Sequence, residues 1–176
     1  MPERHVDRVI VLPGLWMPAI SMAWFAARLR ALGFDARTLG YRSIVDGARY
    51  AIEEIGDALQ AGPAHLVGHS LGGVIALEAL RGHPALPAGR VVCIGSPLCG
   101  SAAARVLRGR RLTGAYLGRA GPLLERGCAQ WPHAVDVGMI AGTRPRGLGG
   151  LVARFDEPHD GTVAVRELSL IHISEP

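Results

Sequence analysis

Short apolar runs alternate with amphipathic stretches along most of the chain. The apolar runs are typical of buried strands and lie at Val6–Leu12, Phe34–Tyr41, Ala64–Val67, Arg90–Gly95 and Val135–Gly142. Between them, hydrophobic positions recur at helical spacing, which predicts helices over Met22–Leu32, Val45–Gln60 and Leu71–Leu80. Strands that alternate with helices in this way predict an α/β fold built on a parallel sheet.

Two of the predicted helices also indicate which of their faces turns inward. In the segment 22–32, one face holds Phe25, Leu29 and Leu32. In the segment 45–60, the inward face holds Ala51, Ile55 and Leu59, and the face toward water holds Glu53, Glu54 and Asp57. Amphipathic helices of this kind cover a sheet with their apolar side.

The segment richest in chemistry lies where a predicted strand passes into a predicted helix, at Gly68-His69-Ser70-Leu71-Gly72. A sharp turn between strand and helix leaves a serine hydroxyl exposed, and the flanking glycines let backbones come close. The N-terminus of the following helix favours developing negative charge. A serine between glycines can also be an ordinary tight turn. The strand before it and the almost wholly apolar helix after it favour a nucleophile elbow.

Four segments of the chain resemble the α/β-hydrolase family, in its bacterial lipase and esterase type. They are Val11-Leu12-Pro13-Gly14-Leu15-Trp16, Gly68-His69-Ser70-Leu71-Gly72-Gly73, Cys93-Ile94-Gly95-Ser96-Pro97 and His159-Asp160-Gly161-Thr162-Val163. The resemblance extends from Val6 to about Glu167 and implies a parallel-sheet α/β-hydrolase fold. The first segment resembles the family's oxyanion loop, and the last resembles the loop that carries the acidic member of its triad.

The resemblance implies that Ser70 is the nucleophile and that Asp160 is the triad acid. Asp160 follows the predicted 135–142 strand in the expected order, although an Asp-Gly pair is also a common turn. Asp156 and Glu157 are the alternatives for the acid.

The resemblance also implies an oxyanion hole made of the backbone N–H groups of Leu15 and Leu71, with Trp16 as the alternative to Leu15. Trp16, His69 and Ser96 are expected to border the substrate pocket. His69 is interpreted as a structural neighbour of the nucleophile rather than its base, because adjacent residues on a sharp turn point apart.

The C-terminus departs from the family pattern, in which a histidine follows the acid. Only His172 follows Asp160, and it lies in Leu-Ser-Leu-Ile-His-Ile-Ser-Glu-Pro, residues 168–176. That nonapeptide matches the translation of a transposase adapter used in sequencing libraries, so we interpret it as an artefact. We therefore expect residues 1–167 to be an incomplete α/β-hydrolase domain without its last strand, histidine and final helix, and this chain to be inactive.

The crossover between Pro97 and His133 is long and contains two short helical patterns, Ser101–Arg108 and Gly121–Arg126. A segment of this length can form a cap over an active site, and a plain crossover with loops fits the pattern equally well. Six hydrophobic residues in it could line an acyl pocket: Leu112, Tyr116, Leu117, Leu123, Leu124 and Trp131.

Composition narrows the class of protein. Hydrophobic residues make up 49% of the chain, which fits one well-covered sheet, and all 19 basic residues are arginine. The formal charge of +4 comes without a dense basic stripe interleaved with aromatics, so nucleic acid is not an expected partner. No apolar run approaches the roughly 18 residues that span a membrane, and no cleavable leader is visible. These features predict a cytoplasmic enzyme.

The three cysteines show no paired spacing of a zinc site, and no motif indicates a metal or other cofactor. Cys93 lies in an apolar strand, whereas Cys99 and Cys128 bracket the crossover and could form a disulfide. The function expected is a serine hydrolase that cleaves a small-molecule or lipid-like carboxylic ester through an acyl-enzyme. The alternatives are a non-catalytic member of the fold that binds a ligand or a protein, and an acyltransferase that uses the same serine.

Overall fold

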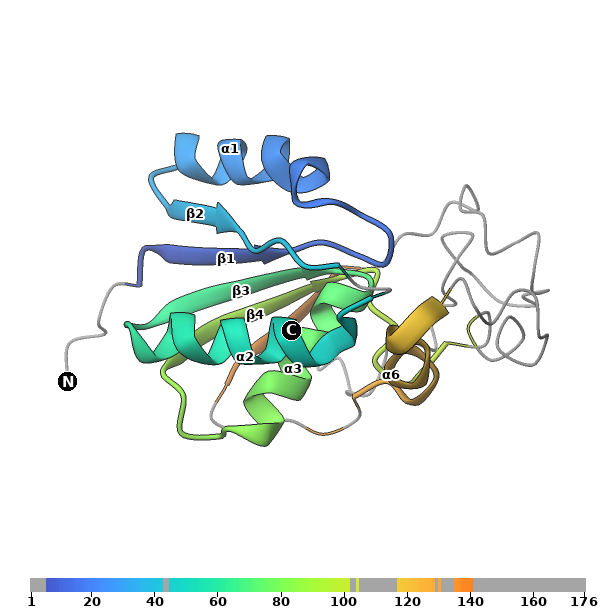
Figure 1. Ribbon diagram of the computed structural model, residues 1–176. Coiled ribbons are helices and arrows are strands. Elements are labelled where there is room, and N and C mark those ends of the chain that lie inside the picture. The colour runs from blue at the N-terminus through green and yellow to red at the C-terminus, as the bar shows by residue number, and fades with distance from the viewer. Residues whose placement is uncertain are drawn as a thin grey trace, which may run out of the picture.

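The computed structural model describes residues 6–42, 45–101, 104, 117–128, 130 and 135–140. In this part of the chain, five strands form one sheet in the order β2-β1-β3-β4-β5 (Figure 1). The strands are β1 (Arg8–Leu12), β2 (Asp35–Thr38), β3 (Ala64–His69), β4 (Ala88–Ile94) and β5 (Val137–Ile140). Every neighbouring pair is parallel, which confirms the predicted α/β fold class.

Helices cover both faces of the sheet. The described helices are η1 (Ala19–Met22), α1 (Ala23–Ala31), α2 (Gly47–Gln60), α3 (Leu71–Gly82), η2 (Gly118–Ala120) and α6 (Gly121–Arg126). Figure 1 shows α1 on one side of the sheet and α2 with α3 on the other. Within the described residues, no helix is both long enough and apolar enough to cross a membrane.

The core lies in two layers, one on each side of the sheet. Successive residues of a strand point to opposite faces. Ile10 and Leu12 of β1 therefore join the larger core under α2 and α3, while Val9 and Val11 join the smaller core under α1. All four side chains are at most 2% exposed. Burial on both faces explains why this strand reads as an unbroken apolar run.

The helix faces follow the predicted pattern with one exception. Ala51, Ile55 and Leu59 of α2 are fully buried, as expected. On α1, the prediction for Leu32 is wrong, because its side chain is 70% exposed. The helix ends at Ala31, and Leu32 is the capping residue beyond it. Its side chain is therefore not held on the helix face that packs against the sheet.

The predicted crossover between residues 97 and 133 is described only in part. Its second helical pattern is confirmed as α6, with the predicted bounds, while most of the first falls outside the described residues. Leu117, Leu123 and Leu124 are buried in the larger core. These three side chains consequently pack under the domain surface, and the other expected pocket residues, Leu112, Tyr116 and Trp131, lie outside the described part of the chain.

The parallel strands bring their carboxyl ends to one edge of the sheet. Leu12, near the end of β1, pairs with Gly68 of β3, and Gly68 pairs with Cys93 of β4. The next residues of these strands lead into the loop after β1, into Ser70 and into the segment after β4. Sheets of this type bind ligands at this edge.

Candidate active site

Ser70 sits in a strained turn between β3 and α3. Its φ of 52° and ψ of −117° place it in a region that residues other than glycine rarely adopt. Backbone hydrogen bonds hold the turn from both sides. The Ser70 amide donates to the Ile94 carbonyl at 2.8 Å, and the Gly73 amide donates to the Ser70 carbonyl at 3.2 Å. The residue is half-buried, so its side chain is not sealed in the core.

The two glycines of the motif are required by close backbone approach. A Cβ atom on Gly68 would overlap the backbone of Gly73 at the start of α3. A Cβ atom on Gly72 would overlap the carbonyl groups of Leu12 and Pro13 at the end of β1. The turn can therefore bring β1, β3 and α3 together only with glycine at both positions.

The loop after β1 closes against the serine. The Met17 amide donates to the Gly14 carbonyl at 3.2 Å, which makes a turn with Trp16 at a φ of 61°. A methyl group on Gly14 would lie 3.2 Å from the Ser70 Cβ atom and 3.0 Å from His69 Nδ1. The structure thus brings together the first two segments that the sequence singled out.

Two backbone amides at this edge are available as hydrogen-bond donors. Within the described residues, the amides of Leu15 and Leu71 donate to no backbone carbonyl. Leu71 is the first residue of α3, and the first amides of a helix lack an intrahelical partner and carry partial positive charge. Leu15 packs partly against the larger core, whereas the neighbouring Trp16 side chain is 51% exposed.

Two further residues support the elbow from beneath. Ser96 is fully buried, and its hydroxyl donates to the Gly68 carbonyl at 3.5 Å. Cys93 is also buried, and this burial raises the pKa of its thiol to about 12. The thiol is therefore protonated near neutral pH and is a poor nucleophile beside Ser70.

Only some of the remaining predicted site residues belong to the part of the chain that the structure describes. Asp160, its alternatives Asp156 and Glu157, and His172 lie outside the described residues. His69 is half-buried as the last residue of β3. Within the described part of the chain, no three His, Cys, Asp or Glu side chains are grouped to hold a metal ion.

The sequence did not single out Tyr41, which the structure places at this edge. Its hydroxyl donates to the carbonyl of Pro13, the first residue of the loop beside Ser70, at 2.6 Å. The two residues are 28 positions apart, so no local pattern signals the contact.

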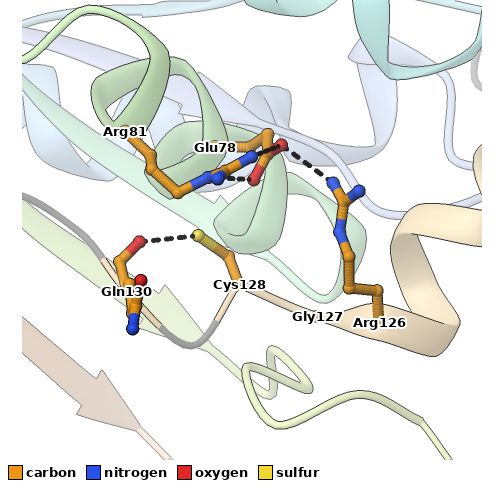
Figure 2. A pocket seen from close by; sticks show the side chains of 6 residues that line it. All are labelled: Glu78, Arg81, Arg126, Gly127, Cys128 and Gln130. Carbon is orange, nitrogen blue, oxygen red and sulfur yellow. Dashed lines mark hydrogen bonds and ion pairs between the residues drawn. The ribbon is translucent and has the colours of Figure 1, made fainter.

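A polar cavity of about 210 Å³ lies at the other end of α3 (Figure 2). The Glu78 carboxylate there accepts from Arg81 at 2.6 Å and from Arg126 at 2.8 Å. Glu78 lies seven positions after Leu71, or roughly 10 Å along the helix axis, and Ser70 does not line the cavity. Figure 2 shows both arginines turned toward the carboxylate, which ties α3 to α6.

Cys128 also lines the cavity. Cys93, Cys99 and Cys128 form no disulfide with one another, so the expected Cys99–Cys128 pairing is not present in the structure. Burial raises the pKa of Cys128 to about 11, and its sulfur donates to the Gln130 carbonyl at 3.2 Å.

Comparison of the sequence with known protein families identifies one matching family. The family model described as "Alpha/beta hydrolase family" matches residues 9–170. No curated protein shows a significant match to the chain.

Solved structures share its fold. The mature form of a Bacillus licheniformis lipase is 21% identical over 97% of this chain and 83% of its own, with a TM-score of 0.73. The propeptide form of that lipase is 22% identical over 97% of this chain and 44% of its own, with a TM-score of 0.74. A Pseudomonas putida N-formylmaleamic acid deformylase is 14% identical over 80% and 76%, with a TM-score of 0.58.

Proposed function

Because this chain belongs to the alpha/beta hydrolase family, we propose that it is a serine hydrolase that cleaves carboxylic esters through an acyl-enzyme. The observation that carries the proposal is the strained Ser70 turn, with the loop after β1 packed against it. Strain of this kind persists only where the surrounding structure enforces it, and it is concentrated at functional sites.

In the first half of the reaction, the Ser70 oxygen attacks the ester carbonyl carbon while a base removes its proton. The carbonyl oxygen becomes an oxyanion, which accepts hydrogen bonds from the amides of Leu15 and Leu71. The intermediate then collapses, the base returns the proton to the leaving alcohol, and the acyl group remains on Ser70. In the second half, water attacks the acyl-enzyme and releases the acid.

We assign the base to a histidine that Asp160 orients, in the manner of a catalytic triad. We place this histidine in the natural sequence beyond residue 167, because residues 168–176 match an adapter. The 176-residue chain is accordingly proposed to be inactive, with turnover lower by about 10⁴-fold or more than that of a chain with the complete triad.

The proposed substrate is a small-molecule or lipid-like ester. The exposed Trp16 ring and the half-buried Leu15 side chain support this choice, because they supply apolar surface on the loop whose Gly14 approaches Ser70. We place the enzyme in the cytoplasm, since Cys93, Cys99 and Cys128 form no disulfide with one another and disulfides are rare in reducing compartments. No cofactor enters the proposed reaction.

The test uses the full-length gene product and p-nitrophenyl esters of increasing acyl length. Ser70→Ala should abolish both hydrolysis and labelling by a fluorophosphonate probe. Ser21→Ala is the matched control, because the Ser21 hydroxyl is exposed and donates to the nearby Pro18 carbonyl. Equal ester hydrolysis by the Ser70→Ala variant would sink the proposal.

The same experiment separates the alternatives. A binding protein of this fold would show neither labelling nor turnover, whereas an acyltransferase would label but form a new ester or amide when an acceptor is supplied. Product analysis by mass spectrometry distinguishes acyl transfer to water from acyl transfer to an acceptor.

A further inference from the structure

We propose that Tyr41 is a positioning residue for the oxyanion hole. Its buried hydroxyl holds the Pro13 carbonyl and thereby fixes the loop that presents the Leu15 amide beside Ser70. The inference rests on the proposed function, in which the Leu15 amide binds the oxyanion. The hydrogen bond from the Tyr41 hydroxyl to the Pro13 carbonyl is 2.6 Å long, and Tyr41 is only 8% exposed.

The sheet delivers Tyr41 to this place. Val11 pairs with Thr38 at the end of β2, and the Leu39 amide then donates to the Val11 carbonyl at 2.9 Å. The segments that follow β1 and β2 thus continue side by side beyond the regular strand pairing. Two residues further along each segment, the Tyr41 hydroxyl donates to the Pro13 carbonyl, and the Tyr41 ring packs into the larger core.

The hydrogen bond from Tyr41 holds the Pro13–Gly14 peptide group, which directly precedes the peptide group that carries the Leu15 amide. Fixing the Pro13 carbonyl fixes the plane of the peptide that joins it to Gly14, because the peptide unit is rigid. The following peptide carries the Leu15 amide. A rotation at Pro13 would therefore change the direction of the Leu15 N–H, and a donor contributes only when it points at the oxyanion.

The loop also needs an anchor because it is strained. Trp16 has a φ of 61°, and such conformations persist where neighbouring contacts over-determine them. The Gly14 carbonyl is held by the Met17 amide at 3.2 Å, and the Pro13 carbonyl by Tyr41. Burial raises the pKa of Tyr41, so its hydroxyl stays protonated and remains a donor throughout the physiological range.

The kinetic test compares Tyr41→Phe with two controls in the full-length protein. Tyr41→Phe removes only the hydroxyl, and we expect kcat for p-nitrophenyl butyrate to fall by roughly tenfold to a hundredfold with KM changed less than about twofold. Tyr50→Phe removes a hydroxyl from the exposed side of α2, where Tyr50 is 44% exposed, and should leave both constants unchanged. Ile55→Val loosens the same core from α2, and it controls for lost stability.

A second readout does not depend on catalysis. With Trp24, Trp131 and any tryptophan encoded beyond residue 167 replaced by phenylalanine, Trp16 is the sole tryptophan and reports on the loop. Tyr41→Phe should increase acrylamide quenching of Trp16, by at most about twofold because the side chain is already 51% exposed. Tyr50→Phe and Ile55→Val should leave the quenching unchanged.

The outcomes separate this inference from the proposed function. Loss of kcat together with increased quenching supports a positioning role, and incorporation of 3-fluorotyrosine at position 41, which restores a hydroxyl, should restore kcat. A kcat loss no larger than that of Ile55→Val, or quenching that stays constant, overturns the inference even if Ser70 is essential. Activity that survives Ser70→Ala would instead refute the proposed function, and the quenching would still report whether Tyr41 holds the loop.

Discussion

Two helical glycines should respond in opposite directions to the same substitution. Gly56 lies within α2, and a Cβ atom added there would meet nothing within 4 Å. Gly56→Ala should therefore stabilise the protein by about 1 kcal/mol, the difference in helix propensity between glycine and alanine. Gly72 lies in the first turn of α3, where an added Cβ atom would approach the Pro13 carbonyl oxygen to 2.7 Å and the Leu12 carbonyl carbon to 2.8 Å.

At Gly72, the free-energy cost of the steric clash opposes the same gain in helix propensity. Overpacking a rigid site costs about 1–3 kcal/mol, which offsets the gain of about 1 kcal/mol from helix propensity. Because the opposing atoms belong to the backbone of Leu12 in β1 and of Pro13 directly after it, we expect the upper end of that range and a net loss of about 2 kcal/mol. The two variants should then differ by about 3 kcal/mol, or roughly 6–12 °C in Tm for a chain of this size.

Thermal and urea unfolding followed by circular dichroism measure this difference directly. Gly82→Ala provides a second control within α3, since an added Cβ atom there also meets nothing within 4 Å. If Gly72→Ala melted at or above the parent protein while Gly56→Ala did not gain stability, the steric reasoning about the elbow would be refuted. Activity should fall with Gly72→Ala alone, because its clash moves Pro13 and hence the loop beside Ser70.

Two further predictions concern titratable side chains. The hydrogen bond from Arg81 lowers the pKa of Glu78 below its usual 4.5, so its carboxylate stabilises the fold above that pH, and this contribution is lost as the pH falls through the lowered pKa. The difference in free energy of unfolding between the parent protein and Glu78→Gln, measured by urea denaturation, should accordingly become smaller as the pH is lowered. A difference that does not change with pH would contradict this prediction. Burial raises the pKa of Cys93 to about 12 and of Cys128 to about 11, so both thiols react slowly near neutral pH. Iodoacetamide should therefore modify the half-buried Cys99 first, which peptide mass spectrometry can show. Earlier modification of Cys93 would contradict the packing.

The order of strands and helices could be predicted from the sequence, because each element carries its own period of apolar positions. The inward face of α2 follows from such spacing, and α6 has the predicted bounds. Leu32 was predicted incorrectly because a helical pattern does not mark where a helix ends. The final residue of a pattern can lie beyond the last turn, where no neighbouring element covers it.

Local chemistry determined one part of the candidate site, and packing decided the rest. The Gly-x-Ser-x-Gly motif predicts the elbow, because a strand, a turn and a helix follow one another without interruption over Ala64–Gly82. The contacts of Tyr41 with Pro13, 28 positions away, and of Arg126 with Glu78, 48 positions away, depend on which strands and helices become neighbours. Such neighbours are chosen by the burial of apolar faces across the whole domain, so only the tertiary structure reveals which side chains support Ser70 and its loop.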